Sequence, residues 1–361
     1  MTKRRPARFP LVLLGMGNVH RNLLRILDRK AGLLAERHGV ALPVVACADR
    51  SGFVLGPEGA GSRLGRPAIH AAKDGGTPLR EIPGSAPLSL AEALDLAGPS
   101  GILLDAASMD LETGGIGLRA ARAALARGQS VVFANKSAVA LAFAELEETA
   151  AATGAGLGWS ATVCGGLPVV NVGRGELVAA RFRRVRGVFN STSNLVLERM
   201  AAGRTLDEAI REAQERGIAE TDPTNDLNGT DTAAKLAIIA RTILGAPVTF
   251  ADVERRGIEA APTPGRDEAV RLFGEAVPGP DGGFRLRVAP HAVPKASFFG
   301  SMGALDMAVE WETDIFGVQR LAATEGDAIP TAAAVLRDAV HIALGRPAAP
   351  PRRAPARRKS A

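Results

Sequence analysis

Short apolar runs alternate with amphipathic segments through the first part of the chain. FPLVLLGMG (9–17), LPVVACADR (42–50), GILLDAAS (101–108) and SVVFANK (130–136) each hold a short apolar run that glycine or polar residues follow. Such runs predict strands that are buried on both faces. NVHRNLLRIL and GLRAARAALARG, which follow two of them, have the spacing of amphipathic helices. Strands that alternate with helices predict an α/β fold with a parallel sheet.

Two helices with clear boundaries are expected in the second part of the chain. Thr205 and Glu208 stand in the spacing of a capping box, so a helix is predicted to begin there and to end at Gly217. A second helix is predicted from Thr230 to Gly245, through the apolar segment KLAIIARTIL. The polar loop between them carries several carboxylates.

Strands are expected around these helices. RRVRGVF, FRLRVAPHAV and LDMAVEWETD are predicted as strands, and WSATVCGGLPVVNVG has strand character around a turn. Residues 261–283 are interpreted as a short helix between turns, and a last helix is predicted from Pro330. The second part therefore predicts another α/β domain, and a length of 361 residues fits two domains.

The composition is that of a globular protein without a membrane segment. Hydrophobic residues make up 46% of the chain, and no apolar run approaches the roughly eighteen residues of a transmembrane helix. The basic N-terminus precedes an apolar run that ends in a glycine turn, which disfavours a signal peptide. Two cysteines, Cys47 and Cys164, fit a reducing compartment. We therefore expect a cytoplasmic protein.

The net charge of +6 comes from the end of the chain. RPAAPPRRAPARRKSA (346–361) holds six basic residues and no acid, which leaves 38 basic and 38 acidic residues elsewhere. This composition predicts a disordered tail. A solvated tail and weak contact with polyanions are both open, and no specific nucleic-acid binding is expected.

A glycine turn between the first strand and the first helix predicts a dinucleotide site. Gly15 and Gly17 allow a tight turn and a close approach of the backbone to a pyrophosphate, and Asn18 and Val19 begin the helix. His20 stands where the fingerprint G-x-G-x-x-G has its third glycine. A packing role for His20 and a contact with the cofactor are both open.

The residue that follows the second strand bears on the choice of cofactor. Asp49 suits the ribose 2′-hydroxyl of NAD, whereas the adjacent Arg50 suits the 2′-phosphate of NADP. Both cofactors therefore stay open. Carboxyl ends of parallel strands meet at one edge of a sheet, so Ser108, Asn135 and Lys136 are expected near the nicotinamide.

The second helix and the loop before it carry the candidate chemistry. Lys235 is an isolated charge on an apolar helix, and Asp231 lies four residues earlier, on the same face. An ordinary surface pair and a proton-transfer site are the two interpretations. Four carboxylates lie close together in the loop and at the start of the helix: Glu220, Asp222, Asp226 and Asp231. Such a cluster favours binding of a substrate ammonium. A metal ion is less favoured, because no His or Cys is nearby. The polar residues 190–194, with Thr192 among them, either cap a helix or line the substrate pocket.

These segments together resemble the homoserine dehydrogenase family over about residues 10–345. GIAETDPTNDLNGTDTAAKLAI is similar to the family's G-[YF]-A-E-x-D-P-x-x-D-x-x-G-x-D-x-x-x-K-L block almost position for position. ANKSAVA, TVCGGLPVV, GVFNSTSN and PTAAAVLRD add to the likeness.

The resemblance implies an NAD(P)-dependent interconversion of L-homoserine and L-aspartate 4-semialdehyde, in threonine, methionine and isoleucine biosynthesis. It implies a Rossmann-type nucleotide domain (1–158, with a returning helix at 329–345), a substrate-binding and dimerisation domain (159–328) and a homodimer. The implied catalytic residues are Lys235 and Lys136, with Asp231 beside Lys235, and the implied substrate acids are Glu220 and Asp226. Backbone carbonyls of Val163, Gly165 and Leu167 are implied as a site for a monovalent cation.

The expected chemistry is the loss of a hydroxyl proton as a hydride leaves the carbon. A Lys whose pKa is lowered by burial and by a second cation would accept that proton near neutral pH. In the reverse direction its ammonium would polarise the aldehyde oxygen.

Three departures from the family pattern keep other functions open. Ser160 replaces a Glu before the cation-site carbonyls, Ser191 replaces a Gly, and EGDAIPT replaces a run of small residues before the last helix. The alternatives are a divergent enzyme that acts on another small amino or hydroxy acid, and a catalytically inactive NAD(P)-binding sensor. An acylating aldehyde dehydrogenase with Cys164 as nucleophile is a further alternative, against a buried structural thiol.

Overall fold

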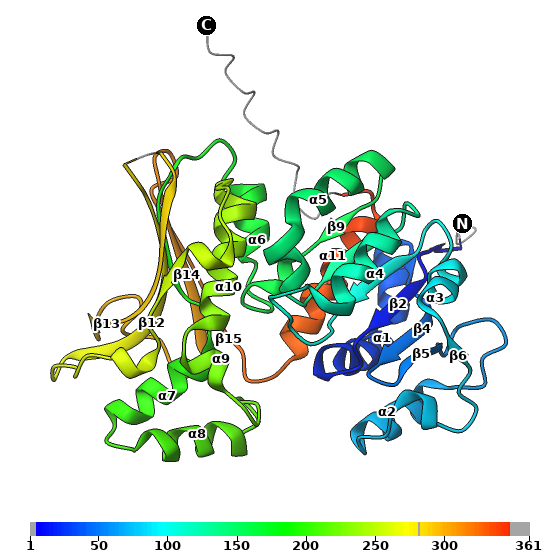
Figure 1. Ribbon diagram of the computed structural model, residues 1–361, viewed down its shortest axis with the longest axis horizontal. Helices are drawn as coiled ribbons and strands as arrows, with labels where there is room; N and C mark the ends of the chain where they lie inside the picture. The colour runs from blue at the N-terminus through cyan, green and yellow to red at the C-terminus, as the bar shows by residue number, and fades with distance from the viewer. Residues whose placement is uncertain (1–4, 281, 347–361) are drawn as a thin grey trace, which may run out of the picture.

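A computed structural model describes residues 5–280 and 282–346, and most of the basic tail predicted at 346–361 lies outside the described residues. Two large sheets divide this part of the chain (Figure 1). The first has seven strands in the order β6-β5-β4-β2-β7-β8-β9. Its strands are β2 (Leu11–Leu14), β4 (Val44–Asp49), β5 (Gly52–Leu55), β6 (Pro87–Leu88), β7 (Ile102–Asp105), β8 (Ser130–Phe133) and β9 (Leu157–Gly158).

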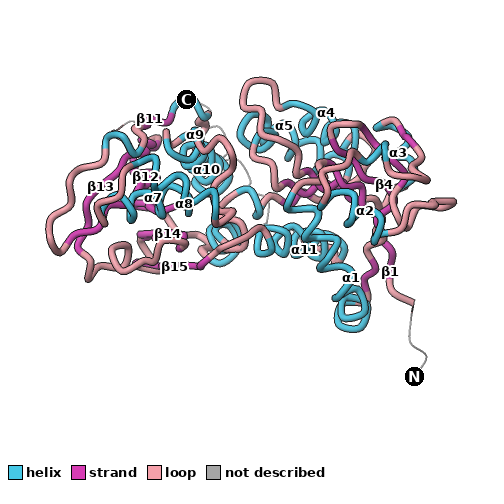
Figure 2. The backbone as a smooth tube through the Cα atoms, turned by 90° about the horizontal axis from the view of Figure 1, so that it is seen from below, coloured by secondary structure: helices cyan, strands magenta, loops and turns pink. Residues whose placement is uncertain are grey.

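Five neighbouring strands of this sheet, from β4 to β9, are parallel, and helices cover both faces. One face is covered by α1 (Asn18–His38), α2 (Arg66–Asp74) and α11 (Ile329–Ala343), whose apolar residues share a core with the alternate residues of the strands. The other face is covered by α3 (Leu90–Ala97), α4 (Gly115–Leu125) and α5 (Ser137–Thr153). Figure 2 shows α1 and α11 on the opposite side of the sheet from α4 and α5. The predicted α/β fold with a Rossmann-type sheet is confirmed.

The sheet changes its winding direction at β2. This strand pairs with β4 on one side and with β7 on the other, so a crevice opens at the carboxyl ends of β2 and β7. Gly15 lies there at φ +93°, where a Cβ atom would come within 2.5 Å of the carbonyl oxygen of Ala106. Only glycine fits this turn.

The second sheet has six strands in the order β11-β13-β12-β10-β14-β15, antiparallel except for β11 and β13. Its strands are β10 (Phe182–Val188), β11 (Val253–Arg255), β12 (Glu268–Pro278), β13 (Phe284–Pro294), β14 (Asp306–Thr313) and β15 (Val318–Thr324). The helices α7 (Ser191–Ala201), α8 (Leu206–Glu215), α9 (Thr224–Leu227) and α10 (Thr230–Ile239) lie on one side of it (Figure 1).

Two sequence-based expectations in this region are wrong. The helix expected within residues 261–283 is the long strand β12, which pairs with β13 over its whole length. The strand expected within residues 159–173 is absent from the described structure. A 3-10 turn (Ser160–Thr162), the short α6 (Val169–Asn171) and a π-helical stretch that begins at Val172 occupy this region instead.

The helices that carry the candidate chemistry form as predicted. Thr205 and Glu208 make a reciprocal capping box at α8, and Gly217 follows that helix with a φ of +68°. Every residue of α10 is buried, and a π-helical turn (Ala240–Leu244) extends it to Gly245. Short elements complete the chain: β1 (Ala7–Arg8), β3 (Val40–Ala41), and 3-10 turns at Leu79–Glu81, Phe250–Asp252 and Ile258–Ala260. Among the described residues, no helix combines the length and apolarity needed to cross a membrane.

Candidate active site

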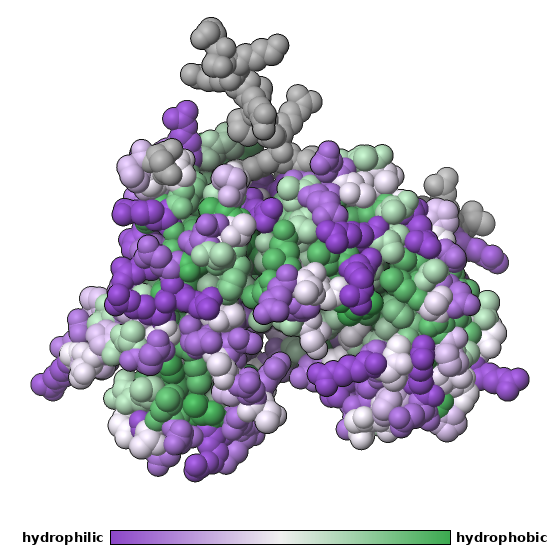
Figure 3. Space-filling view, in the orientation of Figure 1, coloured by the Kyte–Doolittle hydropathy of each residue, from purple (hydrophilic) through white to green (hydrophobic). Residues whose placement is uncertain are grey.

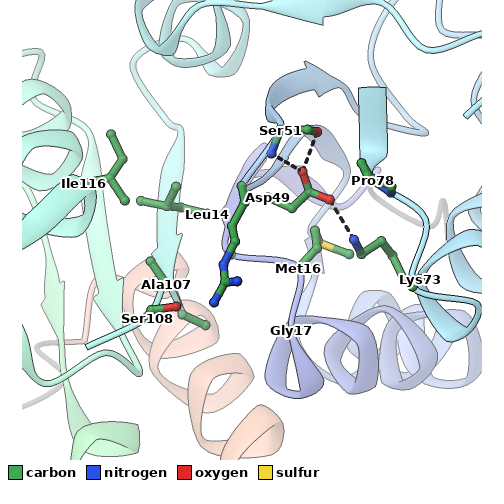
Figure 4. A pocket seen from close by; sticks show the side chains of 14 residues that line it. Leu14, Met16, Gly17, Asp49, Ser51, Lys73, Pro78, Ala107, Ser108 and Ile116 are labelled. Atoms are coloured by element: carbon green, nitrogen blue, oxygen red, sulfur yellow. Dashed lines mark hydrogen bonds and ion pairs between the residues drawn. The ribbon is translucent and has the colours of Figure 1, made fainter. Parts of the chain in front are cut away.

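The crevice at the switch point of the first sheet holds a pocket of about 900 Å³. Gly15, Gly17, Asp49, Arg50 and Ser108, all expected around a dinucleotide, line it. Figure 4 shows Gly17, Asp49 and Ser108 around this pocket. The N-cap of α1 is Gly17, and no side chain caps this helix. The N–H groups of its first turn therefore face the pocket without a side-chain acceptor, which suits a phosphate.

Asp49 is held in place by its neighbours in this pocket. Its carboxylate accepts hydrogen bonds from Lys73 Nζ (2.7 Å) and from the hydroxyl of Ser51 (2.6 Å) (Figure 4). It also accepts one from the backbone N–H of Leu79 (2.9 Å). Burial acts to raise the pKa of Asp49, but these bonds outweigh it and hold the pKa below its usual range. Lys73 was not anticipated from the sequence, because α2 brings it to Asp49 from a distant segment.

His20 lies inside the protein beneath the glycine turn. It is fully buried, and burial lowers its pKa to about 4, with a small opposing effect from the backbone of Gly15. It is therefore neutral near pH 7. The packing role left open above fits this position better than a contact with the cofactor.

A second pocket of about 810 Å³ lies between the two halves of the molecule. Asn18 and Val19 line it from the start of α1, Lys136 from the end of β8, and Asn190 and Lys235 from the second half. The loop 217–222 and the residues before α11 close its rim. Figure 3 shows the surface hollowed between the two halves on this side.

The two candidate lysines meet on one carboxylate in this pocket. Lys235 Nζ lies 2.7 Å from Asp231 Oδ2, and Lys136 Nζ lies 3.2 Å from Asp231 Oδ1. Lys235 also donates to the carbonyl oxygen of Phe189 at 2.6 Å, and Asn190 Nδ2 donates to Asp231 at 2.8 Å. Asp231 and Lys235 are buried, so the interpretation as a surface ion pair is wrong.

The expected lowering of the Lys235 pKa is also wrong. Burial is the largest single influence and lowers the pKa of Lys235, but the attraction and hydrogen bond of Asp231, together with smaller contributions from Cys164 and Asp226, outweigh it and leave the pKa above its usual value. Burial acts to raise the pKa of Asp231, and the two lysines outweigh it and hold that pKa well below its usual range. The expected lowering of this pKa took account of burial and of the second cation, but not of the Asp231 carboxylate, which contacts both lysines.

The remaining acids of the loop take different positions. Glu220 is exposed and lines the rim of the pocket. Asp226 Oδ1 accepts a hydrogen bond from Asn190 Nδ2 at 2.7 Å, and burial, together with repulsion by Asp231, raises the pKa of Asp226. Among the described residues, no group of three or more His, Cys, Asp or Glu side chains is arranged to hold a metal ion.

Two predicted side chains point away from the pockets. Thr192 is buried, and its hydroxyl donates to the carbonyl oxygen of Ile218 at 3.3 Å, so it braces the loop instead of facing the cavity. Asn135 is 6% exposed, and its amide is bonded to Asp105 and Ser137. Both residues therefore lie next to the site with their side chains engaged elsewhere.

Cys164 does not suit the role of a nucleophile. It is 1% exposed, and burial raises the pKa of its thiol to about 12. Its sulfur lies 3.8 Å from the carbonyl oxygen of Phe189. A thiol that stays protonated at neutral pH is a poor nucleophile, which supports the interpretation as a structural thiol.

Glu325, an acid that was not predicted from the sequence, lies beside the turn proposed to bind a cation. Val163 and Leu167 are buried, and at Gly165, with a φ of +53°, a Cβ atom would meet Glu325 Oε2. Glu325 is 8% exposed and accepts a hydrogen bond from the N–H of Gly166. The available signal was an acid in EGDAIPT, where the family has small residues.

Ser160, which replaces a family Glu, faces the last helix. Its N–H and hydroxyl donate to the buried Asp338 at 2.9 and 2.6 Å, and its oxygen accepts from Arg337 at 2.9 Å. The side chain at position 160 therefore joins the turn to α11.

Comparisons with known proteins identify relatives of this chain. A sequence profile described as homoserine dehydrogenase matches residues 168–340. The NAD(+)-dependent homoserine dehydrogenase of Pseudomonas canavaninivorans is 29% identical over 92% of this chain and 96% of its own length. The homoserine dehydrogenase of Mycobacterium leprae is 30% identical over 93% of this chain and 72% of its own length.

Solved structures show the same fold. A hyperthermophilic archaeal homoserine dehydrogenase in complex with NADPH has a TM-score of 0.79 and 28% identity, over 94% of this chain and 99% of that one. The putative homoserine dehydrogenase of Archaeoglobus fulgidus has a TM-score of 0.77 and 28% identity, over 92% of this chain and 99% of that one. Sequence and structure agree along nearly the whole length, so this chain belongs to the homoserine dehydrogenase family.

Proposed function

We propose that this protein interconverts L-homoserine and L-aspartate 4-semialdehyde, with NAD or NADP as hydride carrier. As a family member it is an NAD(P)-dependent oxidoreductase that acts on a CH–OH group. The observation that carries the proposal is the Lys136–Asp231–Lys235 array, whose two lysines line a cavity next to the dinucleotide crevice.

In the reducing direction we assign Lys235 as the acid. Its pKa is raised, so it is an ammonium at neutral pH and donates a hydrogen bond to the aldehyde oxygen. The nicotinamide, when bound, supplies the hydride. As the carbonyl carbon becomes an alcohol carbon, the oxygen takes a proton from Lys235. Asp231 and Lys136 keep the resulting amine oriented.

In the oxidising direction the same groups act in reverse. The hydroxyl proton passes to Lys235, which must first be deprotonated, and a raised pKa makes that form scarce at neutral pH. Oxidation of homoserine is therefore expected to accelerate as the pH rises. Reduction of the aldehyde is expected to be efficient near pH 7.

The substrate's polar ends are assigned to the acids of the loop. Glu220 lies at the rim of the cavity, where it can receive the substrate ammonium. Asp226 is assigned a place beside Asp231, because the amide of Asn190 donates a hydrogen bond to each of the two carboxylates. Thr192 supports the loop through its hydrogen bond to the carbonyl oxygen of Ile218.

The cofactor pocket suits both dinucleotides. Asp49 retains its position for a ribose hydroxyl, while Arg50 and Lys73 add positive charge that suits a 2′-phosphate. Residues 1–158 with 329–345 are proposed as the nucleotide domain, and residues 159–328 as the substrate and dimerisation domain.

A monovalent cation at the carbonyls of Val163, Gly165 and Leu167 stays part of the proposal. The nearby carboxylate of Glu325 supports it, because three neutral carbonyls and one carboxylate suit an ion of single charge. Comparing turnover in potassium, sodium and tetramethylammonium salts tests this idea, and identical rates in all three would contradict it.

A homodimer through the open face of the second sheet is also proposed. Helices cover one face, whereas the other carries a row of charges that alternate in sign across five paired strands; the row is Arg287, Glu275, Arg186, Glu310 and Arg320. Such a row can pair with its own copy about a two-fold axis. A cytoplasmic location stays a prediction.

The decisive experiment follows the absorbance of reduced nicotinamide with L-homoserine, with NAD and NADP tested separately. Wild type, Lys235→Ala and the control Lys30→Ala, which changes an exposed lysine of α1, are compared. We expect turnover that falls at least about a hundredfold in Lys235→Ala and is unchanged in the control. Cofactor binding without turnover of homoserine would favour another substrate or a sensor, because Ser191 at the cavity wall departs from the family pattern.

A further inference from the structure

A buried carboxyl group stands at the end of β7, outside the groups assigned above. Asp105 is 1% exposed. Its Oδ1 accepts a hydrogen bond from the N–H of Ala107 at 3.0 Å, and its Oδ2 accepts one from Asn135 Nδ2 at 3.3 Å. Within the described ranges no lysine or arginine forms an ion pair with it. A buried acid without a cation is costly, so its presence here needs a specific role.

Uncharged residues of the neighbouring strands and of α4 surround Asp105. Its register neighbours are Leu14 on β2 and Phe133 on β8, and α4 faces it with Gly117, so none of the three is charged. A Cβ atom on Gly117 would come within 2.2 Å of Asp105 Oδ2. Burial raises the pKa of Asp105 to about 6, with the bonds from Ala107 and Asn135 acting in the opposite direction.

The hydrogen bonds continue from Asp105 across the ends of two strands. Asn135 Oδ1 accepts from the N–H of Ser137 at 3.0 Å and from its hydroxyl at 2.9 Å. The hydroxyl of Ser137 in turn accepts from the N–H of Asp110 at 2.8 Å. The carbonyl oxygen of Asp105 also accepts from the N–H groups of Ala134 and Asn135, at 2.8 and 3.0 Å.

Both segments joined in this way carry parts of the site. The residues after β7, Ala106 to Ser108, line the cofactor pocket. Lys136 stands between Asn135 and Ser137, and its ammonium reaches Asp231. Asp105 therefore fixes the backbone on both sides of Lys136, and it touches neither pocket itself.

We propose that Asp105, acting through Asn135, is a positioning residue that sets Lys136 against Asp231. The ionised form fits this role, since both carboxylate oxygens must accept from N–H groups. The inference rests on the proposed reaction, because its effect is measured on turnover.

Exchanging the residues at positions 105 and 135 tests the hydrogen bonds of this pair separately from the location of its negative charge. In Asp105→Asn, two amide groups face each other as donors, and the chain to Ser137 is broken or strained. In Asp105→Asn/Asn135→Asp, the amide introduced at position 105 accepts from Ala107 and donates to the carboxylate introduced at position 135. That carboxylate accepts from Ser137. Every hydrogen bond is then restored, with the charge moved from one member of the pair to the other.

We expect kcat of Asp105→Asn to fall at least about tenfold, with KM for the cofactor changed less than about threefold. The double variant should recover to within about threefold of wild type. Glu112→Gln, an exposed acid in the same loop, is the control and should match wild type. If Asp105→Asn does not fold, Ser137→Ala breaks the same chain one step later and should show the same selective fall in kcat.

The pH profile gives a readout that a purely structural role would not move. In the reducing direction, where Lys235 stays an ammonium, the kcat of the wild type should decline as the pH falls through about 6, when Asp105 takes up a proton, and that decline should be absent in Asp105→Asn. Unchanged kcat in Asp105→Asn, or a double variant as slow as the single one, would overturn the proposal. A wild type that binds cofactor, measured by fluorescence of the reduced nicotinamide, but is inactive with homoserine would instead overturn the proposed reaction.

Discussion

Asp231 holds both lysines of the candidate site with one carboxylate. The sequence predicted the pair with Lys235, because four residues on a helix bring two side chains to the same face. It could not predict the contact with Lys136, which comes from the other half of the molecule. The protonation state of Lys235 depends on its contact with the Asp231 carboxylate, which is why burial and a second cation led to the wrong direction for its pKa.

Replacing Asp231 by Asn should impair both stability and turnover. The buried ammonium of Lys235 and the partly buried ammonium of Lys136 would lose their counter-charge; removing one partner of a buried ion pair costs about 3–5 kcal/mol. The pKa of Asp231 is lowered in the folded protein, so its contribution is present above the pKa of the unfolded chain and is lost as the pH falls. Urea unfolding at pH 7 measures the loss, with the exposed Asp207→Asn as control. Equal stability of both variants would show that the lysines need no anion.

Removing the charge of Glu325 should stabilise the folded protein, in contrast to removing the charge of Asp231. Burial raises its pKa, so the ionised form destabilises the folded protein above that pKa, and the penalty disappears as the pH falls and the acid takes up a proton. Glu325→Gln keeps an acceptor for the N–H of Gly166 and removes the charge.

In tetramethylammonium buffer, which leaves the proposed cation site without its ion, we expect Glu325→Gln to raise the melting temperature at pH 8 and to match wild type at pH 4. Differential scanning fluorimetry across that range provides the measurement, with the exposed Glu148→Gln as control. A melting temperature that drops at pH 8 in this buffer would contradict the prediction, whereas a drop in potassium or sodium salt alone would indicate that a bound cation neutralises Glu325.

Among the elements, the strands and helices with local signals were predictable. β2, β4, β7 and β8 are short apolar runs with turn residues after them, and α8 and α10 carry their own boundaries in the sequence. β12 was missed because Glu268, Arg271 and Glu275 recur at helical spacing. Its conformation is fixed by pairing with β13 and β10, which are distant or later in the chain.

The capping box of α8 gives a prediction at this scale. Thr205→Ala removes the acceptor for the N–H of Glu208 and should lower the free energy of unfolding by about 1 kcal/mol. Activity at 25 °C should be unchanged, because α8 contributes no residue to either pocket. Urea titration measures the difference against the exposed neighbour Arg204→Ala. A variant as stable as that control would mean that α8 needs no cap.

At the scale of the whole molecule, the open face of the second sheet predicts how copies associate. Arg287 is exposed at one end of the alternating charge row. Arg287→Glu breaks the alternation without entering the core, and should weaken a dimer at least about tenfold. Sedimentation velocity over a range of concentrations measures this, with Arg119→Glu on α4 as the control.

A dimer that is unaffected by Arg287→Glu would place the interface on another face. The alternating charge row could not be predicted from the sequence, because it depends on the pairing register of five strands. Each residue taken alone looks like an ordinary surface charge.

The last helix has a consequence for how the protein is made. α11 covers the same face of the first sheet as α1, and Val335 and Ala339 share a core with Leu11, Leu13 and Val132. During synthesis these strands leave the ribosome first, and the whole second sheet follows before α11 emerges. Part of one face of the first sheet therefore stays exposed to chaperones until α11 has emerged. The first sheet is expected to complete its packing only after the second sheet has been synthesised.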